Sequence, residues 1–230
     1  RNGALVGEYA VKELPRVQLV AKMLGKDFDD LAAIKKGSTE ASQSAAKSAL
    51  IEAKGVGHRG SIKPFDLKIF PGEVIGLSGL LGSGRSELAR SIYGADQPDS
   101  GDLLVHGRKT KIHAPIDAIN LGMGYLPENR KEEGIISELS VRENMMIALQ
   151  AKSGAFHLLS KKEQIALTEK YINLLQIKVA DADAPVRQLS GGNQQKVILA
   201  RWLITEPDFL ILDEINKIAI PFSANSRTSF

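Results

Sequence analysis

One glycine-rich segment constrains the fold of this chain more than any other. Before it, the apolar run at residues 74–78 predicts a buried parallel strand. After it, Leu88 and Ile92 lie one helical turn apart, which predicts a helix over residues 87–93 that stops at Gly94. Between them is the pattern G-x-x-x-x-G-[K/R]-[S/T] of a phosphate-binding loop. Its residues are Gly79, Leu80, Leu81, Gly82, Ser83, Gly84, Arg85 and Ser86.

The chemistry of such a loop follows from its residue types. Glycines allow backbone N–H groups to turn towards phosphate oxygens, and the helix N-terminus adds the positive end of a dipole. The Ser86 hydroxyl can bind a magnesium ion, and Arg85 can contact the outer phosphates. Arg85 stands where lysine is usual, and a planar guanidinium does not replace a compact ammonium. The loop therefore predicts nucleotide binding, whereas fast hydrolysis does not follow from it, and a ligand-free strand–helix turn is the alternative.

Composition excludes several classes of protein. The 230 residues suffice for one large domain, or for one domain with appendages. The net charge is +3 and the basic residues are scattered, so no nucleic-acid footprint is indicated. Cysteine is absent, which excludes a disulfide framework and thiolate metal sites. No run approaches the roughly 20 apolar residues of a membrane span. The chain opens on Arg1 with no signal peptide and no initiator methionine, so we expect a fragment.

The remaining pattern predicts strands and helices in alternation. Alternating runs at residues 50–53 and 65–69 predict edge strands. Strands are also predicted at residues 102–106 and 124–126, with a short helix at 115–120 between them. This alternation indicates a parallel sheet. The small, polar residues 37–49 predict a linker that follows the end of another domain at residues 1–36.

A helical region interrupts the alternation at about residues 128–188. Ser140 with Glu143, and Ser160 with Glu163, have the spacing of capping boxes that open two helices. The adjacent residues Met145 and Met146 are interpreted as core.

Two further motifs follow. A helix over residues 196–203 is preceded by a serine and two glycines, which suit phosphate binding at a helix N-terminus, although a simple cap is the alternative. The apolar strand at 209–212 ends in Asp213 and Glu214, which suit a magnesium-side carboxylate and a water-activating base, or else are solvated acids. The motif that precedes the helix at 196–203 comprises Leu189, Ser190, Gly191, Gly192, Asn193 and Gln194.

Together, the three motifs resemble the ATP-binding cassette of ABC transporters over roughly residues 50–214. The segments at 79–86, 125–131 and 189–197 are most similar to the second cassette of tandem sugar-importer ATPases, nearest the galactofuranose type. The resemblance implies an α/β P-loop NTPase fold of ABC-cassette type. Its expected parts are a parallel-sheet core, an antiparallel β edge and a helical subdomain. Residues 1–36 would then be the tail of a preceding cassette.

The resemblance also implies ATP and Mg²⁺ as cofactors. Residues 79–86 would hold the phosphates, and Ser86 and Asp213 the metal. Glu214 would be the general base, and Glu128 occupies the position where most cassettes have a metal-sensing glutamine. The signature residues 189–194 would complete the ATP site of an opposite cassette. His58 and Phe65 are candidates for the aromatic that stacks on adenine, with core packing as the alternative for Phe65.

The implied assembly is a sugar importer. Its partners would be a membrane permease subunit, a first cassette or a second copy, and indirectly a periplasmic sugar-binding protein, but no nucleic acid. The module would lie peripherally on the cytoplasmic side of the inner membrane. A non-catalytic partner cassette is the alternative, because Arg85 and Glu128 depart from the usual residues.

The chain departs from the family pattern after Glu214. The expected Pro-Thr-x-Gly-x-Asp is missing, and residues 215–230 are interpreted as an unrelated or out-of-frame tail. We therefore expect a C-terminally incomplete domain, with an inactive truncated product as a further alternative.

Overall fold

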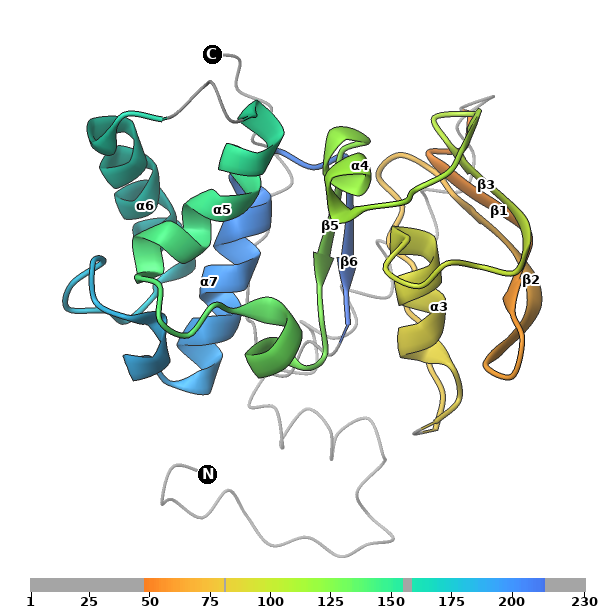
Figure 1. The fold of residues 1–230 in the computed structure, drawn as a ribbon, viewed down its shortest axis with the longest axis horizontal. Coiled ribbons are helices and arrows are strands. Elements are labelled where there is room, and N and C mark those ends of the chain that lie inside the picture. The colour runs from red at the N-terminus through yellow and green to blue at the C-terminus, as the bar shows by residue number, and fades with distance from the viewer. Residues whose placement is uncertain (1–47, 81, 155–158, 214–230) are drawn as a thin grey trace, which may run out of the picture. The chain divides into compact units, whose positions relative to one another are not determined.

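The computed structural model describes residues 48–80, 82–154 and 159–213 (Figure 1). The predictions for residues 1–36, for most of the linker, for Leu81, for Glu214 and for the tail at 215–230 lie outside the described residues. No helix in the described ranges combines the length and the hydropathy that crossing a bilayer requires.

An antiparallel sheet forms the first part of the fold. It contains β1 (Ile51–His58), β2 (Ile62–Ile69), β3 (Ser100–Val105) and β4 (Arg108–Thr110) in the order β2-β1-β3-β4. The strands predicted near residues 50, 65 and 102 are present, but β1 is internal rather than an edge strand, because it pairs with both β2 and β3.

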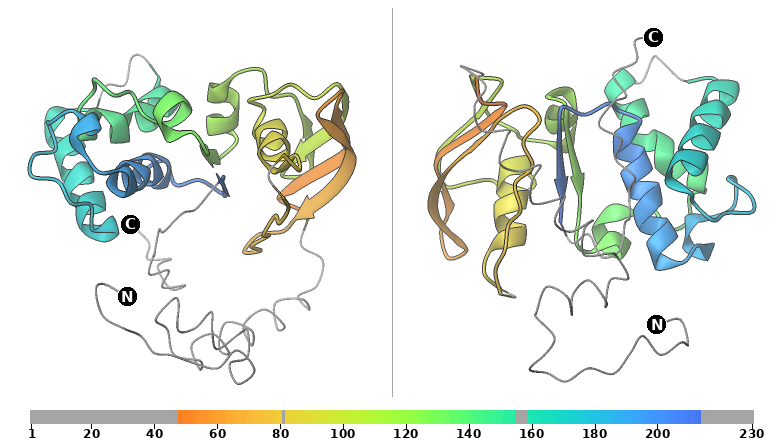
Figure 2. Two further views of the ribbon diagram at one scale, coloured as in Figure 1. Left: turned by 90° about the horizontal axis from the view of Figure 1, so that it is seen from below. Right: turned by 180° about the vertical axis from the view of Figure 1, so that it is seen from behind.

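A parallel pair of strands lies on the other side of α3 (Arg85–Tyr93) (Figures 1 and 2). It consists of β5 (Met123–Leu126) and β6 (Phe209–Leu212), paired from Met123 with Phe209 to Leu126 with Leu212. The predicted helix α4 (Pro115–Asn120) leads into β5. The expected parallel core is therefore present as two strands in register, so their carboxyl ends coincide.

The strand predicted at residues 74–78 is wrong. Residues 73–80 have no regular secondary structure, and Val74 and Leu80 are 94% and 85% exposed. A strand is stabilised by hydrogen bonds to a neighbouring strand. Within the described residues, β6 pairs only with β5, and neither sheet includes this segment. The apolar composition of the run favours burial, but it carries no information about a pairing partner.

The helical part follows β5. It comprises the π-helical turn η1 (Arg130–Gly134), α5 (Val141–Ser153), α6 (Lys161–Leu175), the 3-10 turn η2 (Val186–Gln188) and α7 (Gly191–Leu203). Both predicted capping boxes are confirmed. The Ser140 hydroxyl accepts from the Glu143 N–H at 3.1 Å, while the Glu143 carboxylate accepts from the Ser140 N–H at 2.8 Å. Helix α7 begins five residues earlier than predicted, at Gly191.

One hydrophobic core joins these parts, and Met145 and Met146 belong to it, as predicted. A buried cation lies within it. Arg201 on α7 donates to the carbonyls of Gly134 and Asn144 at 2.6 and 2.7 Å, and to the Asn144 side-chain oxygen at 3.0 Å. Burial lowers the pKa of Arg201 to about 10, so the side chain remains charged at neutral pH. These bonds join α7 to α5 and to the end of η1.

Candidate functional site

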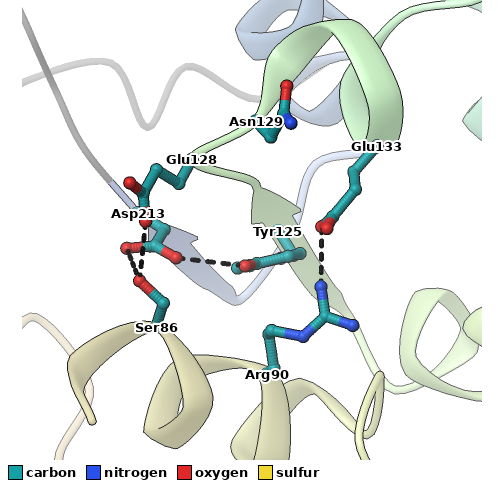
Figure 3. A pocket seen from close by; sticks show the side chains of 7 residues that line it. All are labelled: Ser86, Arg90, Tyr125, Glu128, Asn129, Glu133 and Asp213. Carbon is teal, nitrogen blue, oxygen red and sulfur yellow. Dashed lines mark hydrogen bonds and ion pairs between the residues drawn. The ribbon is translucent and has the colours of Figure 1, made fainter. Parts of the chain in front are cut away.

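Three side chains converge where the parallel strands end. Asp213 directly follows β6, Glu128 lies two residues beyond β5, and Ser86 is the second residue of α3. The Asp213 N–H donates to the Leu126 carbonyl at 2.9 Å, which holds the two strand ends together. The Ser86 hydroxyl lies 3.0 Å from a Glu128 carboxylate oxygen and 3.1 Å from Oδ1 of Asp213 (Figure 3).

The donor set suits a hard cation. A hydroxyl has one hydrogen, so Ser86 cannot donate to Glu128 and Asp213 at the same time. Three oxygens, two of them from carboxylates, therefore face one another with a single hydrogen between them. Within the described residues there is no group of three or more His, Cys, Asp or Glu side chains that could hold a metal alone. Magnesium is commonly bound by one or two carboxylates together with water and substrate phosphates, and these residues fit that requirement.

A pocket of about 350 Å³ surrounds this cluster. It includes Arg90, one helical turn after Ser86 on α3, whose guanidinium donates to Glu133 at 2.7 Å and to both oxygens of Asp96 at 2.8 and 3.0 Å. Hydrogen bonding to Arg90 lowers the pKa of Asp96. Because two carboxylates already neutralise Arg90, the pocket keeps an excess of negative charge. The lining residues are Ser86, Arg90, Tyr125, Glu128, Asn129, Glu133 and Asp213.

Tyr125 lines the pocket beside Asp213. Its hydroxyl donates to Oδ2 of Asp213 at 3.2 Å, and its ring stacks on Tyr93 with 5.2 Å between centroids. Burial, and then the charge of Asp213, raise the pKa of Tyr125, so the hydroxyl stays protonated at neutral pH. Sequence reasoning gave no role in the site to Tyr125, Arg90, Asn129 or Glu133, although Tyr125 and Asn129 lie in the segment 125–131 that carries the family resemblance. The position of Arg90 four residues after Ser86 was a usable signal, because that spacing puts both on one helix face.

The phosphate loop leads into α3 through glycines with left-handed backbone angles. Gly82 has φ 75° and Gly84 has φ 88°, a region that other residues rarely adopt. Gly84 is the N-cap of α3, and Arg85 is its first residue. The Ser83 N–H donates to the carbonyl of Leu80 at 3.1 Å. Gly79 packs against the Ser83 side chain, so a Cβ at this position would overlap it.

The signature residues gather at the N-terminus of α7, and none of them lines the pocket. Ser190 is the N-cap and is exposed, as is Gly192. The Asn193 amide donates to the Ser190 hydroxyl at 3.1 Å. Gln194 is buried and donates to the Leu189 carbonyl at 3.1 Å.

Arg130 connects the signature residues to the pocket, since it follows the pocket residue Asn129. Its Nε donates to Oε1 of Gln194 at 3.3 Å.

The two aromatic candidates have other contacts. His58 Nδ1 lies 3.1 Å from the Gln97 carbonyl and 3.2 Å from Oδ2 of Asp99. Phe65 is partly buried and packs against the core, which is the alternative expected for it. The adenine-binding role stays a prediction for both.

Comparisons with known proteins agree with this geometry. The family described as ABC transporter matches residues 62–217. The fructose import ATP-binding protein FruK of Bifidobacterium longum (strain NCC 2705) is 46% identical over 214 residues, which are 93% of this chain and 42% of that protein. The galactofuranose transporter ATP-binding protein YtfR of Escherichia coli (strain K12) has the same identity and coverage. The chain therefore spans less than half the length of these relatives.

Solved structures show the same fold. The ATP-binding cassette MJ0796, in a post-hydrolysis state bound to ADP and Pi, superposes with a TM-score of 0.62 at 24% identity, covering 71% of this chain and 73% of that one. This likeness confirms the predicted cassette-type α/β fold. Since the family match also extends over more than half of the sequence, the chain belongs to the ABC transporter family.

Proposed function

We propose that this chain is the ATP-binding and ATP-hydrolysing module of an ABC transporter that imports a sugar. The observation that carries the proposal is the position of the Ser86 hydroxyl between Glu128 and Asp213, directly behind a glycine loop at a helix N-terminus. FruK and YtfR are named for fructose import and galactofuranose transport, which supports a sugar as the transported substrate. The chain would be one part of a longer subunit of that kind.

The roles of the residues follow from their chemistry. Residues 79–86 bind the nucleotide phosphates through backbone N–H groups, and Arg85 adds positive charge. Ser86 and Asp213 would hold Mg²⁺, and Glu128 lies within hydrogen-bond distance of Ser86. A magnesium ion bound by these residues would supply positive charge that offsets the charge on the phosphates during transfer. Glu214, which lies outside the described residues, would act as the general base that activates the attacking water.

The signature residues act on a second cassette. Ser190 and Gly192 are exposed at the start of α7 and outside the pocket, so a phosphate on another subunit could approach them. The partners would be a first cassette or a second copy, a membrane permease and, indirectly, a periplasmic sugar-binding protein. The module would lie on the cytoplasmic face of the inner membrane. The match to FruK covers 93% of the chain and so extends upstream of residue 48, which supports residues 1–36 as the tail of a preceding cassette.

A nucleotide titration tests the proposal. Binding of a fluorescent ATP analogue is measured with Mg²⁺ and with EDTA, in the parent and in Ser86→Ala. We expect the parent to bind more tightly with Mg²⁺, and Ser86→Ala to lose about tenfold of that Mg²⁺-dependent affinity while keeping its affinity in EDTA. Ser153→Ala, at the end of α5, is the control and should match the parent. If the parent binds the analogue neither with Mg²⁺ nor with EDTA, the proposal is contradicted.

Hydrolysis is tested separately from binding. Single-turnover phosphate release from the longer subunit, compared with its Glu214→Gln variant, distinguishes an ATPase from a module that only binds nucleotide. Equal release by the two would contradict the catalytic part of the proposal.

A further inference from the structure

We propose that Tyr125 is a positioning residue for the metal-side carboxylate, Asp213. Its phenol hydroxyl would set the orientation in which Asp213 faces Ser86 and a divalent cation. This inference rests on the proposed function and adds to it a residue that none of the three sequence motifs contains.

Both oxygens of the Asp213 carboxylate have a partner. Oδ1 lies 3.1 Å from the Ser86 hydroxyl, and Oδ2 accepts from the Tyr125 hydroxyl at 3.2 Å (Figure 3). The backbone N–H of Asp213 is bonded to β5 as well, through the Leu126 carbonyl at 2.9 Å. Two neighbouring residues of β5 thus hold the backbone and the side chain of Asp213, and the plane of the carboxylate is defined.

The hydroxyl that holds Oδ2 is itself held rigidly. Tyr125 is 8% exposed, and its ring stacks on that of Tyr93. The Tyr93 ring in turn packs in a T-shaped arrangement with Trp202, with 6.2 Å between the ring centroids. A ring packed in this way cannot move its hydroxyl without disturbing the core. A phenol hydroxyl is protonated at neutral pH, so it is available as a donor to the carboxylate.

No other donor performs this task in the described part of the chain. Arg90 also lines the pocket, but its guanidinium bonds Asp96 and Glu133, and none of its described contacts is with Asp213. Without the phenol, Oδ2 would be free and the carboxylate could rotate about its Cβ–Cγ bond. Hydrogen-bond partners that orient a metal-binding carboxylate typically contribute 10- to 100-fold to metal affinity. Because the bond to Tyr125 is fairly long, we expect an effect near the lower end.

The experiment removes the hydroxyl alone. Tyr125→Phe keeps the stacked ring, and Tyr93→Phe is the matched control, because it removes a hydroxyl from the other ring of the same stack. The measurement is a Mg²⁺ titration of fluorescent-ATP binding, at a fixed nucleotide concentration, together with the nucleotide affinity in EDTA. We expect Tyr125→Phe to require about tenfold more Mg²⁺ for half-saturation, with its affinity in EDTA unchanged. Tyr93→Phe should match the parent in both measurements.

The other outcomes are distinct. If the parent binds in a Mg²⁺-dependent way and Tyr125→Phe matches it within twofold, the role of Tyr125 is overturned and the proposed function stands. If Tyr125→Phe loses affinity equally in Mg²⁺ and in EDTA, or if Tyr93→Phe behaves like it, the ring is only structural and the inference is overturned. If the parent shows no Mg²⁺-dependent binding, the proposed function fails and this inference fails with it.

Discussion

The contact between Arg130 and Gly191 predicts that Gly191→Ala changes the free energy of unfolding in opposite directions depending on whether Arg130 is present. Gly191 is the first residue of α7, and the Arg130 guanidinium lies against it. A Cβ at Gly191 would come 2.5 Å from Nη2 of Arg130 and 3.0 Å from its Cζ. Gly191→Ala must therefore displace the guanidinium, and we expect this displacement to break its 3.3 Å bond to Gln194.

The magnitude follows from two opposing effects. A hydrogen bond from a charged donor contributes about 1.5–3 kcal/mol, and the length of this bond places it at the lower end. Alanine is favoured over glycine inside a helix by up to about 1 kcal/mol, of which we expect about half at the first position. Gly191→Ala should thus lower the free energy of unfolding of the parent by about 1 kcal/mol. In a chain that already carries Arg130→Ala there is no clash, so Gly191→Ala should raise the free energy of unfolding by about 0.5 kcal/mol.

A double-mutant cycle by urea denaturation measures this coupling, which should be about 1.5 kcal/mol. Gly192→Ala is the matched control, because a Cβ there meets nothing within 4 Å, and its effect should be the same in both backgrounds. If Gly191→Ala and Arg130→Ala are additive within about 0.5 kcal/mol, the reasoning is refuted.

Three further predictions concern the loop, the acid limb of stability and the core. Gly84→Ala should weaken nucleotide binding in the fluorescence titration, whereas Gly55→Ala, also at positive φ but in β1, should not. Hydrogen bonds within the capping box lower the pKa of Glu143 from its ordinary 4.5. Its contribution to stability is therefore complete above pH 4.5 and is lost as the pH falls through the lowered pKa. Glu143→Gln should reduce the fall of the melting temperature as the pH is lowered through this range. Arg201→Met leaves three buried oxygens without this donor and should cost about 3 kcal/mol in urea unfolding, against less than about 1 kcal/mol for the exposed Arg187→Met.

The family resemblance predicted that Ser86 and Asp213 act together, and the fold gives a physical reason for the meeting of Asp213 with Glu128. Parallel strands paired in register end at the same edge, so residues that follow two such strands meet there. The capping boxes and α4 were equally predictable, because their signals are local. Each depends on residues three or four positions apart and not on the rest of the chain.

Other features depend on contacts that no local pattern encodes. The run at 74–78 is apolar enough for a buried strand, yet a strand also needs a partner, and the described chain gives it none. Tyr125 looks like any aromatic residue of a strand until β6 places Asp213 beside its hydroxyl, 88 positions away. From the sequence, Arg201 would be expected on the exposed face of a helix, whereas in the structure it is buried and donates to three oxygens.

The segment after Glu128 lies between the pocket and the signature residues and contacts both. Residues 130–134 form a π-helical turn. Glu133 of this turn accepts from Arg90 of α3 at 2.7 Å, and Arg130 donates to Gln194 of α7 at 3.3 Å. This turn therefore contacts both the phosphate-loop helix α3 and the signature helix α7. The same few residues therefore link the pocket residue Arg90 to the surface proposed to meet a second cassette.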